Sequence, residues 1–207
     1  MSVRVKICGI TRAEDALAAA DAGADALGFM FVPSSPRCIT PAQAAAISRV
    51  LPPFIARVGV FVNPTEAEVR GAIRESGIDT LQFHGEETPE FCRGFGLPVL
   101  KAFRVRDTAS LKLLAQFQEE TWLLDSFVPG QHGGTGAVFN WDLAATAIQQ
   151  GGRVILAGGL TPENAAEAVR RVRPYALDVS SGVESAPGIK DASKVRRFIE
   201  ASKAPFS

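Results

Sequence analysis

An alternation of short apolar runs with helix-forming segments constrains the fold of this chain more than any other feature. Eight such units occur, at intervals of about 25 residues. Because each return from one strand to the next passes through a helix, the strands are expected to be parallel, with right-handed crossovers. Eight units close into a (β/α)8 barrel, a TIM barrel, and 207 residues are near the minimal length for that fold.

The expected elements follow one another without a break in the pattern. Strands are predicted over residues 3–8, 26–31, 56–62, 80–83, 99–103, 122–125, 154–157 and 176–179. Helices are predicted over residues 11–22, 40–49, 63–76, 108–118, 140–149, 161–172 and 191–201, and another starts at residue 88. Four helices begin with Thr or Asn before Pro, at residues 40, 63, 88 and 161, and Thr11 with Glu14 has the pattern of a capping box.

One domain covering residues 1–207 is expected, because no stretch rich in Pro, Gly or Ser separates two parts. An open, doubly wound sheet is the alternative that the same alternation permits. In a barrel the active site lies at the C-terminal ends of the strands. The polar residues at those ends are therefore the candidates for function.

Composition limits the partners of the chain. Lys plus Arg and Asp plus Glu both number 22, so no net charge favours nucleic acid or an anionic membrane surface. Three cysteines without a C-x-x-C spacing argue against a disulfide framework and a zinc site, and they fit a reducing cytoplasm. No uncharged apolar run approaches the roughly 20 residues of a membrane span. A soluble, cytoplasmic protein is expected, without a metal.

The first strand carries a row of polar residues, which is unusual for a strand that is expected to be buried on both faces. Arg4, Lys6 and Cys8 share one face of a strand whose other face is apolar, so either an internal ion pair or a site is expected there. A cation near Cys8 favours the thiolate, which is the reactive form. The alternative is a small buried hydrophobic residue. Cys38 and Cys92 lack this placement and are expected to be structural.

Other strand ends carry polar residues. Asp125 follows an apolar run, where a carboxylate is costly unless it faces a polar site, and burial raises a carboxyl pKa toward the range useful to a general acid. A loop-capping aspartate is the alternative. Gln82 and His84 share one face of the fourth strand, and Asp178 lies on the eighth. Arg37 is either a carboxylate-binding fork or a solvated loop residue.

Two loops suit a phosphate. Gly158 and Gly159 follow the seventh strand, and Ser181 and Gly182 follow the eighth, the usual phosphate position of this fold. A tight turn is the alternative for the first pair. The glycine-rich stretch within residues 126–139 lacks the residues of a P-loop and is expected to be a mobile loop, with a role as a lid left open.

Nine motifs, in this order, resemble the phosphoribosylanthranilate isomerase family of tryptophan biosynthesis. They are KICGIT at 6–11, GF at 28–29, SPR at 35–37, GVFV at 59–62, QFHG at 82–85, LD at 124–125, GGTG at 133–136, AGGL at 157–160 and DVSSGVE at 178–184; PGIKD at 187–191 also fits. Phe83 stands where a leucine is expected and should point outward under a helix.

The resemblance implies an Amadori rearrangement without a cofactor. N-(5'-phosphoribosyl)anthranilate, an aldosylamine, would become 1-(2-carboxyphenylamino)-1-deoxyribulose 5-phosphate. Asp125 would be the general acid toward the ribose ring oxygen, and Cys8 the general base toward C2. Arg37 would hold the anthranilate. The phosphate would lie on Gly158, Gly159, Ser181 and Gly182, and supporting roles would fall to Lys6, Gln82, His84 and Asp178.

Three further implications concern partners and competitors. The chain leaves no room for the indole-glycerol-phosphate synthase to which some relatives are fused, and monomer and homodimer both remain open. A related isomerase that acts on the aminoaldose of the histidine pathway would be expected to carry aspartate in place of Cys8, so the cysteine argues against that enzyme. Another phosphosugar isomerase or an aldolase on this barrel remains the enzymatic alternative, with Lys101 as the Schiff-base lysine. A phosphate-binding or catalytically lapsed barrel remains the non-enzymatic one.

Overall fold

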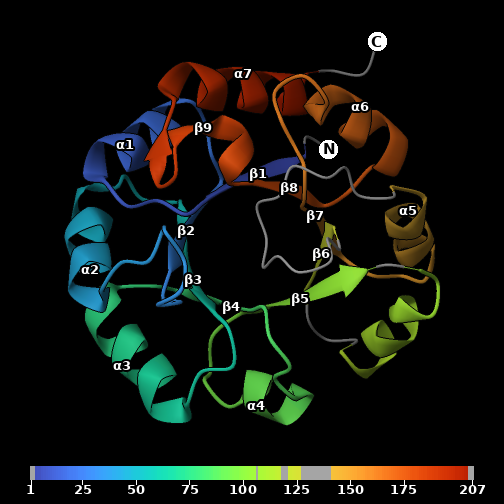
Figure 1. The fold of residues 1–207 in the computed structure, drawn as a ribbon, viewed down its shortest axis with the longest axis horizontal. Helices are drawn as coiled ribbons and strands as arrows, with labels where there is room; N and C mark the ends of the chain where they lie inside the picture. Colours follow the sequence, from blue (N-terminus) through green and yellow to red (C-terminus); the bar gives the residue numbers. More distant parts are fainter. Residues whose placement is uncertain (1–2, 106, 118–120, 127–140, 205–207) are drawn as a thin grey trace.

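Eight parallel strands close into a barrel (Figure 1), which confirms the predicted fold and rules out the open sheet. The structure is a computed structural model, and it describes residues 3–105, 107–117, 121–126 and 141–204. Each strand pairs with the next, and the last pairs with the first. The strands are β1 (Arg4–Cys8), β2 (Ala26–Met30), β3 (Ala56–Phe61), β4 (Thr80–Phe83), β5 (Val99–Val105), β6 (Thr121–Ser126), β7 (Val154–Leu156) and β8 (Ala176–Val179).

Helices surround the barrel on its outer side (Figure 1). They are α1 (Ala13–Asp21), α2 (Pro41–Val50), α3 (Glu66–Ser76), α4 (Pro89–Arg93), α5 (Trp141–Gln149), α6 (Ala165–Val172) and α7 (Ala192–Lys203). After β8 come a short 3-10 helix, η2 (Ser181–Val183), and a hairpin of β9 (Glu184–Ala186) and β10 (Ile189–Lys190). The stretch 126–139, for which a role as a lid is left open, lies outside the described residues except for Ser126. Asn140 lies outside them too.

The helix expected over residues 108–118 is instead a 3-10 helix, η1 (Ser110–Gln116). It buries Leu111 and Leu114, three residues apart. Side chains with this spacing lie directly above one another in a 3-10 helix, so its tighter winding places both against the core.

Two of the predicted Pro-containing helix starts are confirmed, and one is displaced. Thr40 caps α2 in a capping box with Gln43, and the Thr88 hydroxyl accepts from the backbone of α4. The start predicted at Asn63 is wrong. Asn63 has a left-handed backbone with φ of 48°, and Thr65 caps α3.

Two other helices begin later than predicted. The Thr11 hydroxyl donates to the Gly188 carbonyl at 2.5 Å and does not cap α1, which begins at Ala13. After β7, the Thr161 hydroxyl accepts from the backbone N–H of Glu163, and Asn164 accepts from the backbone N–H of Thr161. Thr161 therefore caps a turn, and the regular helix α6 begins only at Ala165.

The apolar residues form two layers. The outward faces of the strands pack against the helices, and Phe83, fully buried, packs there against the rings of Phe61, Phe91 and Phe95, as predicted. Burying such a ring contributes about 2 kcal/mol. A smaller cluster fills the barrel: Leu100, Ala102, Leu123, Ile155, Ala157 and Ala176. This filling makes the barrel a packed core, so a ligand is received only at its end.

Among the described residues, no helix is long and apolar enough to cross a membrane.

Candidate active site

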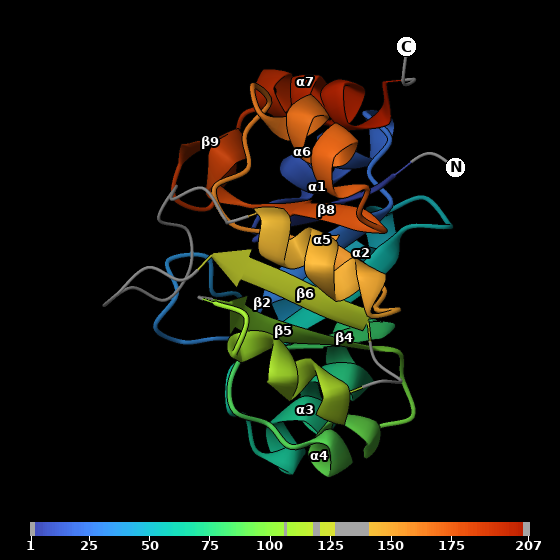
Figure 2. The same ribbon diagram turned by 90° about the vertical axis from the view of Figure 1, so that its right-hand side faces the viewer.

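A pocket of about 540 Å³ opens at the C-terminal end of the barrel. In Figure 2 this is the end toward which the β6 arrow points and at which β9 lies. Ten of the predicted site residues line the pocket. The eleventh, Lys6, precedes Cys8 by two residues on β1. The ten are Cys8, Arg37, Gln82, His84, Asp125, Gly158, Gly159, Asp178, Ser181 and Gly182. The topology thus brings together residues that are far apart in the sequence.

Lys6 and Asp178 form a buried ion pair inside the barrel. They are paired in register across β1 and β8, and Lys6 Nζ donates to Asp178 Oδ1 at 2.8 Å. Their side chains are 3% and 10% exposed. Removing one partner of such a pair typically costs about 3–5 kcal/mol, because the other charge stays buried. The polar row of the first strand is therefore explained in part by an internal ion pair.

Cys8 lies above this pair, and its thiol has a raised pKa. Burial raises the pKa most; Lys6 lowers it, and Asp178 raises it again. The expectation that Lys6 would favour the thiolate is therefore wrong in its net direction. The physical reason is first that burial disfavours the charged thiolate, and second that Asp178 offsets part of the effect of Lys6.

Space for the thiol depends on Gly28, which is paired with Cys8 across β1 and β2. A Cβ atom at Gly28 would lie 2.7 Å from Cys8 Sγ and 3.2 Å from Lys6 Nζ. Only glycine leaves both side chains where they are.

Asp125 ends β6 on the pocket wall and is 8% exposed. Around the barrel, β7 and β8 separate it from Cys8, so the two groups face the pocket from different sides. His84 Nε2 lies 3.5 Å from Asp125 Oδ2. A group placed between β1 and β6 is thus within reach of a thiol on one side and a carboxyl group on the other.

Arg104 also lines the pocket and was missed by the sequence argument. It is exposed and lies opposite Asp125 in the register of β5 and β6. The predicted strand stopped at Phe103, one residue short. Leu100 and Ala102 face the barrel interior, so the alternation along this strand was the signal that places Arg104 on the same face.

Gln82 is 2% exposed, and its side-chain oxygen accepts no hydrogen bond from the described residues. Because burying a polar atom without a partner costs about 1–3 kcal/mol, this oxygen is suited to a donor on a ligand. Gln82 lines the pocket, so the acceptor is available there.

The glycine loops form a close-packed backbone surface. Gly158 and Gly159 have φ of 84° and 64°, a left-handed conformation that side chains disfavour. A Cβ atom at Gly182 would overlap the backbone oxygen of Leu160. The backbones of the loops after β7 and β8 are therefore in contact with each other. This close packing allows main-chain N–H groups from both loops to approach one anion.

Arg37 is engaged by a carboxylate of this chain. Its Nε and Nη2 atoms donate to the two carboxylate oxygens of Glu184, at 2.8 and 2.6 Å. The planar fork is therefore occupied in the structure. Glu184, like its partner Lys190, was not a predicted site residue, since nothing local in the sequence links it to Arg37.

Lys101 faces away from the pocket. Its ammonium donates to the Gly85 carbonyl at 2.7 Å and to Glu87 at 3.0 Å, and its side chain is 4% exposed. It alternates with the inward-facing Leu100 and Ala102, so it lies in the outer layer. This position removes the lysine on which the aldolase alternative depended.

No group of three or more His, Cys, Asp or Glu side chains is placed to hold a metal ion within the described parts of the chain.

Comparisons with known proteins agree on one family. The family model described as N-(5'phosphoribosyl)anthranilate (PRA) isomerase matches residues 5–201. The N-(5'-phosphoribosyl)anthranilate isomerase of Thiobacillus denitrificans is 57% identical over 206 residues, which are 99% of this chain and 100% of the relative. That of Pelobacter propionicus is 55% identical over 201 residues, 97% of this chain and 96% of the relative.

Solved structures that resemble this chain include phosphoribosyl anthranilate isomerases. Phosphoribosyl anthranilate isomerase from Thermotoga maritima superimposes with a TM-score of 0.93 at 43% identity, covering 98% of this chain and 100% of the other. A second structure of such an isomerase, in complex with reduced 1-(o-carboxyphenylamino)-1-deoxyribulose 5-phosphate, has a TM-score of 0.89 at 41% identity, with the same coverage. This chain therefore belongs to the N-(5'-phosphoribosyl)anthranilate isomerase family.

Proposed function

We propose that this chain isomerises N-(5'-phosphoribosyl)anthranilate in tryptophan biosynthesis, with Asp125 as general acid and Cys8 as general base. The observation that carries the proposal is the position of these two groups on different sides of one pocket, with the glycine loops in its wall. The related isomerase that binds a reduced form of the product supports the choice of substrate.

The reaction requires a general acid that donates one proton to the substrate and a general base that removes another. Asp125 donates a proton to the ribose ring oxygen, the bond from that oxygen to C1 breaks, and a protonated Schiff base forms. Cys8 then removes the proton at C2, and the electron pair neutralises the nitrogen to give an enolamine. Tautomerisation to the ketone completes the isomerisation without an oxidant or a cofactor. This division of roles requires Asp125 in its protonated form and Cys8 as the thiolate.

The two ends of the substrate are anchored separately. Gly158, Gly159, Ser181 and Gly182 hold the phosphate, and Arg37 faces the anthranilate carboxylate. Supporting roles in orientation and charge balance fall to Lys6, Gln82, His84 and Asp178. Holding both ends places C1 and C2 between the acid and the base, which lowers the entropy cost of reaching the transition state.

Gly182→Ala is expected to raise KM by about 10- to 100-fold, because the new methyl group pushes the two loops apart and the charge-assisted bonds to the phosphate are lost. Steady-state kinetics measure this change. Gly71→Ala in α3 is the matched control, because its Cβ would meet nothing closer than 4.0 Å. An unchanged KM in Gly182→Ala would contradict a phosphate at these loops.

The rate of Cys8 alkylation by iodoacetamide is expected to rise with pH from about 6.5 to above about 8.5. Burial raises the pKa of Cys8, so the thiolate that acts as base is a minor form at pH 7, and it grows about tenfold per pH unit below the pKa. Alkylation is measured against Cys8→Ser as the blank, because kcat/KM also depends on the protonation of Asp125, the general acid. An alkylation rate that does not change with pH would contradict a raised pKa for Cys8.

We further propose that residues 1–207 form one domain that acts in the cytoplasm on a small phosphorylated substrate, without nucleic acid or membrane. The proposed site residues all come from one chain, so a monomer suffices for catalysis, and a homodimer would contain two independent sites.

The function is tested by the fluorescence decay of freshly prepared N-(5'-phosphoribosyl)anthranilate. Purified protein should remove the signal far faster than spontaneous hydrolysis does, with the deoxyribulose phosphate as the product. If the protein does not exceed the spontaneous rate, the isomerase proposal fails. A phosphate-binding or catalytically lapsed barrel would then remain, to be examined by screening phosphosugars.

A further inference from the structure

Three charged side chains form a chain that leads from the wall of the pocket, where Arg37 lies, into the protein. Glu184 accepts from Arg37 on both oxygens, at 2.8 and 2.6 Å, and from Lys190 Nζ at 2.8 Å. The side chains of Glu184 and Lys190 are 5% and 1% exposed, and that of Arg37 is 15% exposed. Burial acts to raise the pKa of Glu184, but the bonds from Arg37 and Lys190 lower it overall. Glu184 is therefore an anion between two cations.

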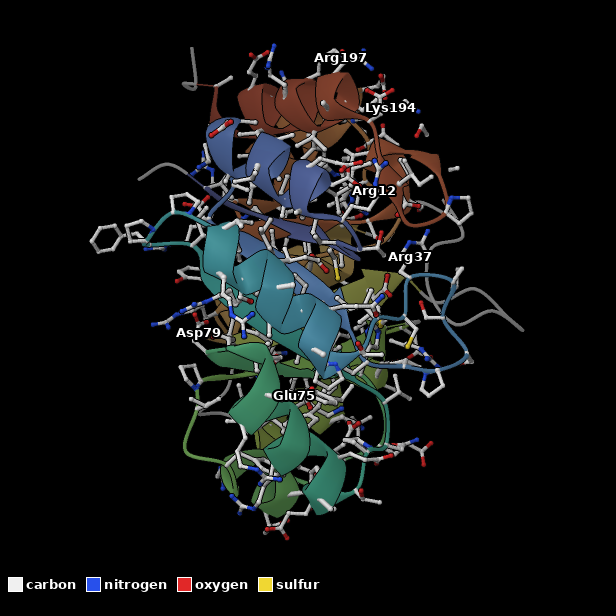
Figure 3. The ribbon with its side chains drawn as sticks, turned by 90° about the vertical axis from the view of Figure 1, so that its left-hand side faces the viewer. Arg12, Arg37, Glu75, Asp79, Lys194 and Arg197 are labelled. Carbon is white, nitrogen blue, oxygen red and sulfur yellow. The ribbon has the colours of Figure 1, made fainter. Side chains whose placement is uncertain are left out.

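The hairpin that carries Glu184 is fixed to the scaffold. Thr11 donates to the Gly188 carbonyl, and Asp15 accepts from the backbone N–H of Lys190 at 3.0 Å. From α7, Lys194 donates to the Glu184 carbonyl at 2.9 Å. Figure 3 shows Lys194, Arg12 and Arg37 along one edge of the molecule, at the loop end of the barrel. Contacts from α1 and α7 thus fix the hairpin, so Glu184 has a defined position from which it binds Arg37.

Arg37 has little freedom in this arrangement. Its stem crosses Gly9, where a Cβ atom would lie 2.5 Å from Arg37 Cδ. With Nε and Nη2 bound to Glu184, a bidentate pair fixes the plane of the guanidinium. Nη1 is the nitrogen left for a ligand in the pocket that Arg37 lines.

We propose that Glu184 is a positioning residue that aims Arg37 Nη1 at the carboxylate of the substrate and thereby sets the preference for a carboxylated aromatic ring. The inference rests on the proposed substrate. Arg37, Glu184 and Lys190 together carry one positive charge, which suits one carboxylate. In Glu184→Gln, Arg37 loses the bidentate pair, because an amide has only one acceptor oxygen, and Lys190 loses its anionic partner.

The test compares two ligands. One is reduced 1-(2-carboxyphenylamino)-1-deoxyribulose 5-phosphate, and the other is the same compound without the carboxylate. In the wild-type protein, calorimetry should show about 10- to 100-fold weaker binding of the second ligand, the loss of one charge-assisted hydrogen bond. In Glu184→Gln the difference between the two ligands should fall below about threefold, while the ligand without the carboxylate binds as it does to the wild-type protein.

Two further variants separate aiming from folding. Arg37→Lys keeps the charge but cannot donate two parallel bonds to Glu184, so it should also lose the preference. Glu66→Gln, which breaks an exposed ion pair with Arg70 on α3, should keep it. If Glu184→Gln or Arg37→Lys folds and retains the wild-type preference, the inference is overturned. If the wild-type protein binds neither ligand, the proposed function fails, and the inference with it.

Discussion

Asp125→Asn is expected to lower kcat by about 10³-fold or more, because an amide cannot give a proton to the ribose ring oxygen. Asparagine has nearly the same shape as aspartate, so the pocket wall of β6 and the contact with His84 should be kept. The ring would then open only at the rate that solvent protons allow. Stopped-flow or manual fluorescence decay of the substrate measures the loss.

The loss must be confined to the chemical step. Affinity for the reduced product should change by less than about threefold, since the phosphate and the carboxylate anchors remain. Asp142→Asn on α5 is the matched control, because that side chain is 75% exposed and forms an ion pair with Arg171 on the surface. Retention of near-wild-type kcat in Asp125→Asn would remove Asp125 from the acid role.

The barrel could be predicted because its signal is local. Each predicted strand lies within two residues of the observed one at both ends, since the alternation of apolar side chains acts over a few neighbours. The helix starts were predicted less well. Thr11 has the right residue type for a cap, but its hydroxyl donates to the Gly188 carbonyl, and the Thr161 hydroxyl caps a turn that precedes α6. Such conflicts are expected where loops carry function.

The membership of the site was also predictable, because strand ends converge at one end of any such barrel. Its electrostatics were not. Burial raises the pKa of Cys8 against the effect of Lys6, and Asp178, paired with Lys6 across 172 residues, raises it further. The pairing of Arg37 with Glu184 spans 147 residues and engages Nε and Nη2 of the guanidinium. Charges act through distance in space, and no local pattern gives that distance.

Cys8→Ser is expected to lower kcat by about 10³-fold or more, because a serine hydroxyl in this buried position does not ionise near neutral pH and cannot remove the proton at C2. Serine fits the space beside Gly28, and the Lys6–Asp178 pair remains, so the fold and the affinity for the reduced product should be kept. Substrate deuterated at C2 assigns the step. Deprotonation limits the residual reaction of Cys8→Ser, which should show a primary isotope effect, whereas ring opening limits Asp125→Asn, which should show none. The same isotope effect in both variants would contradict the division of roles between Cys8 and Asp125.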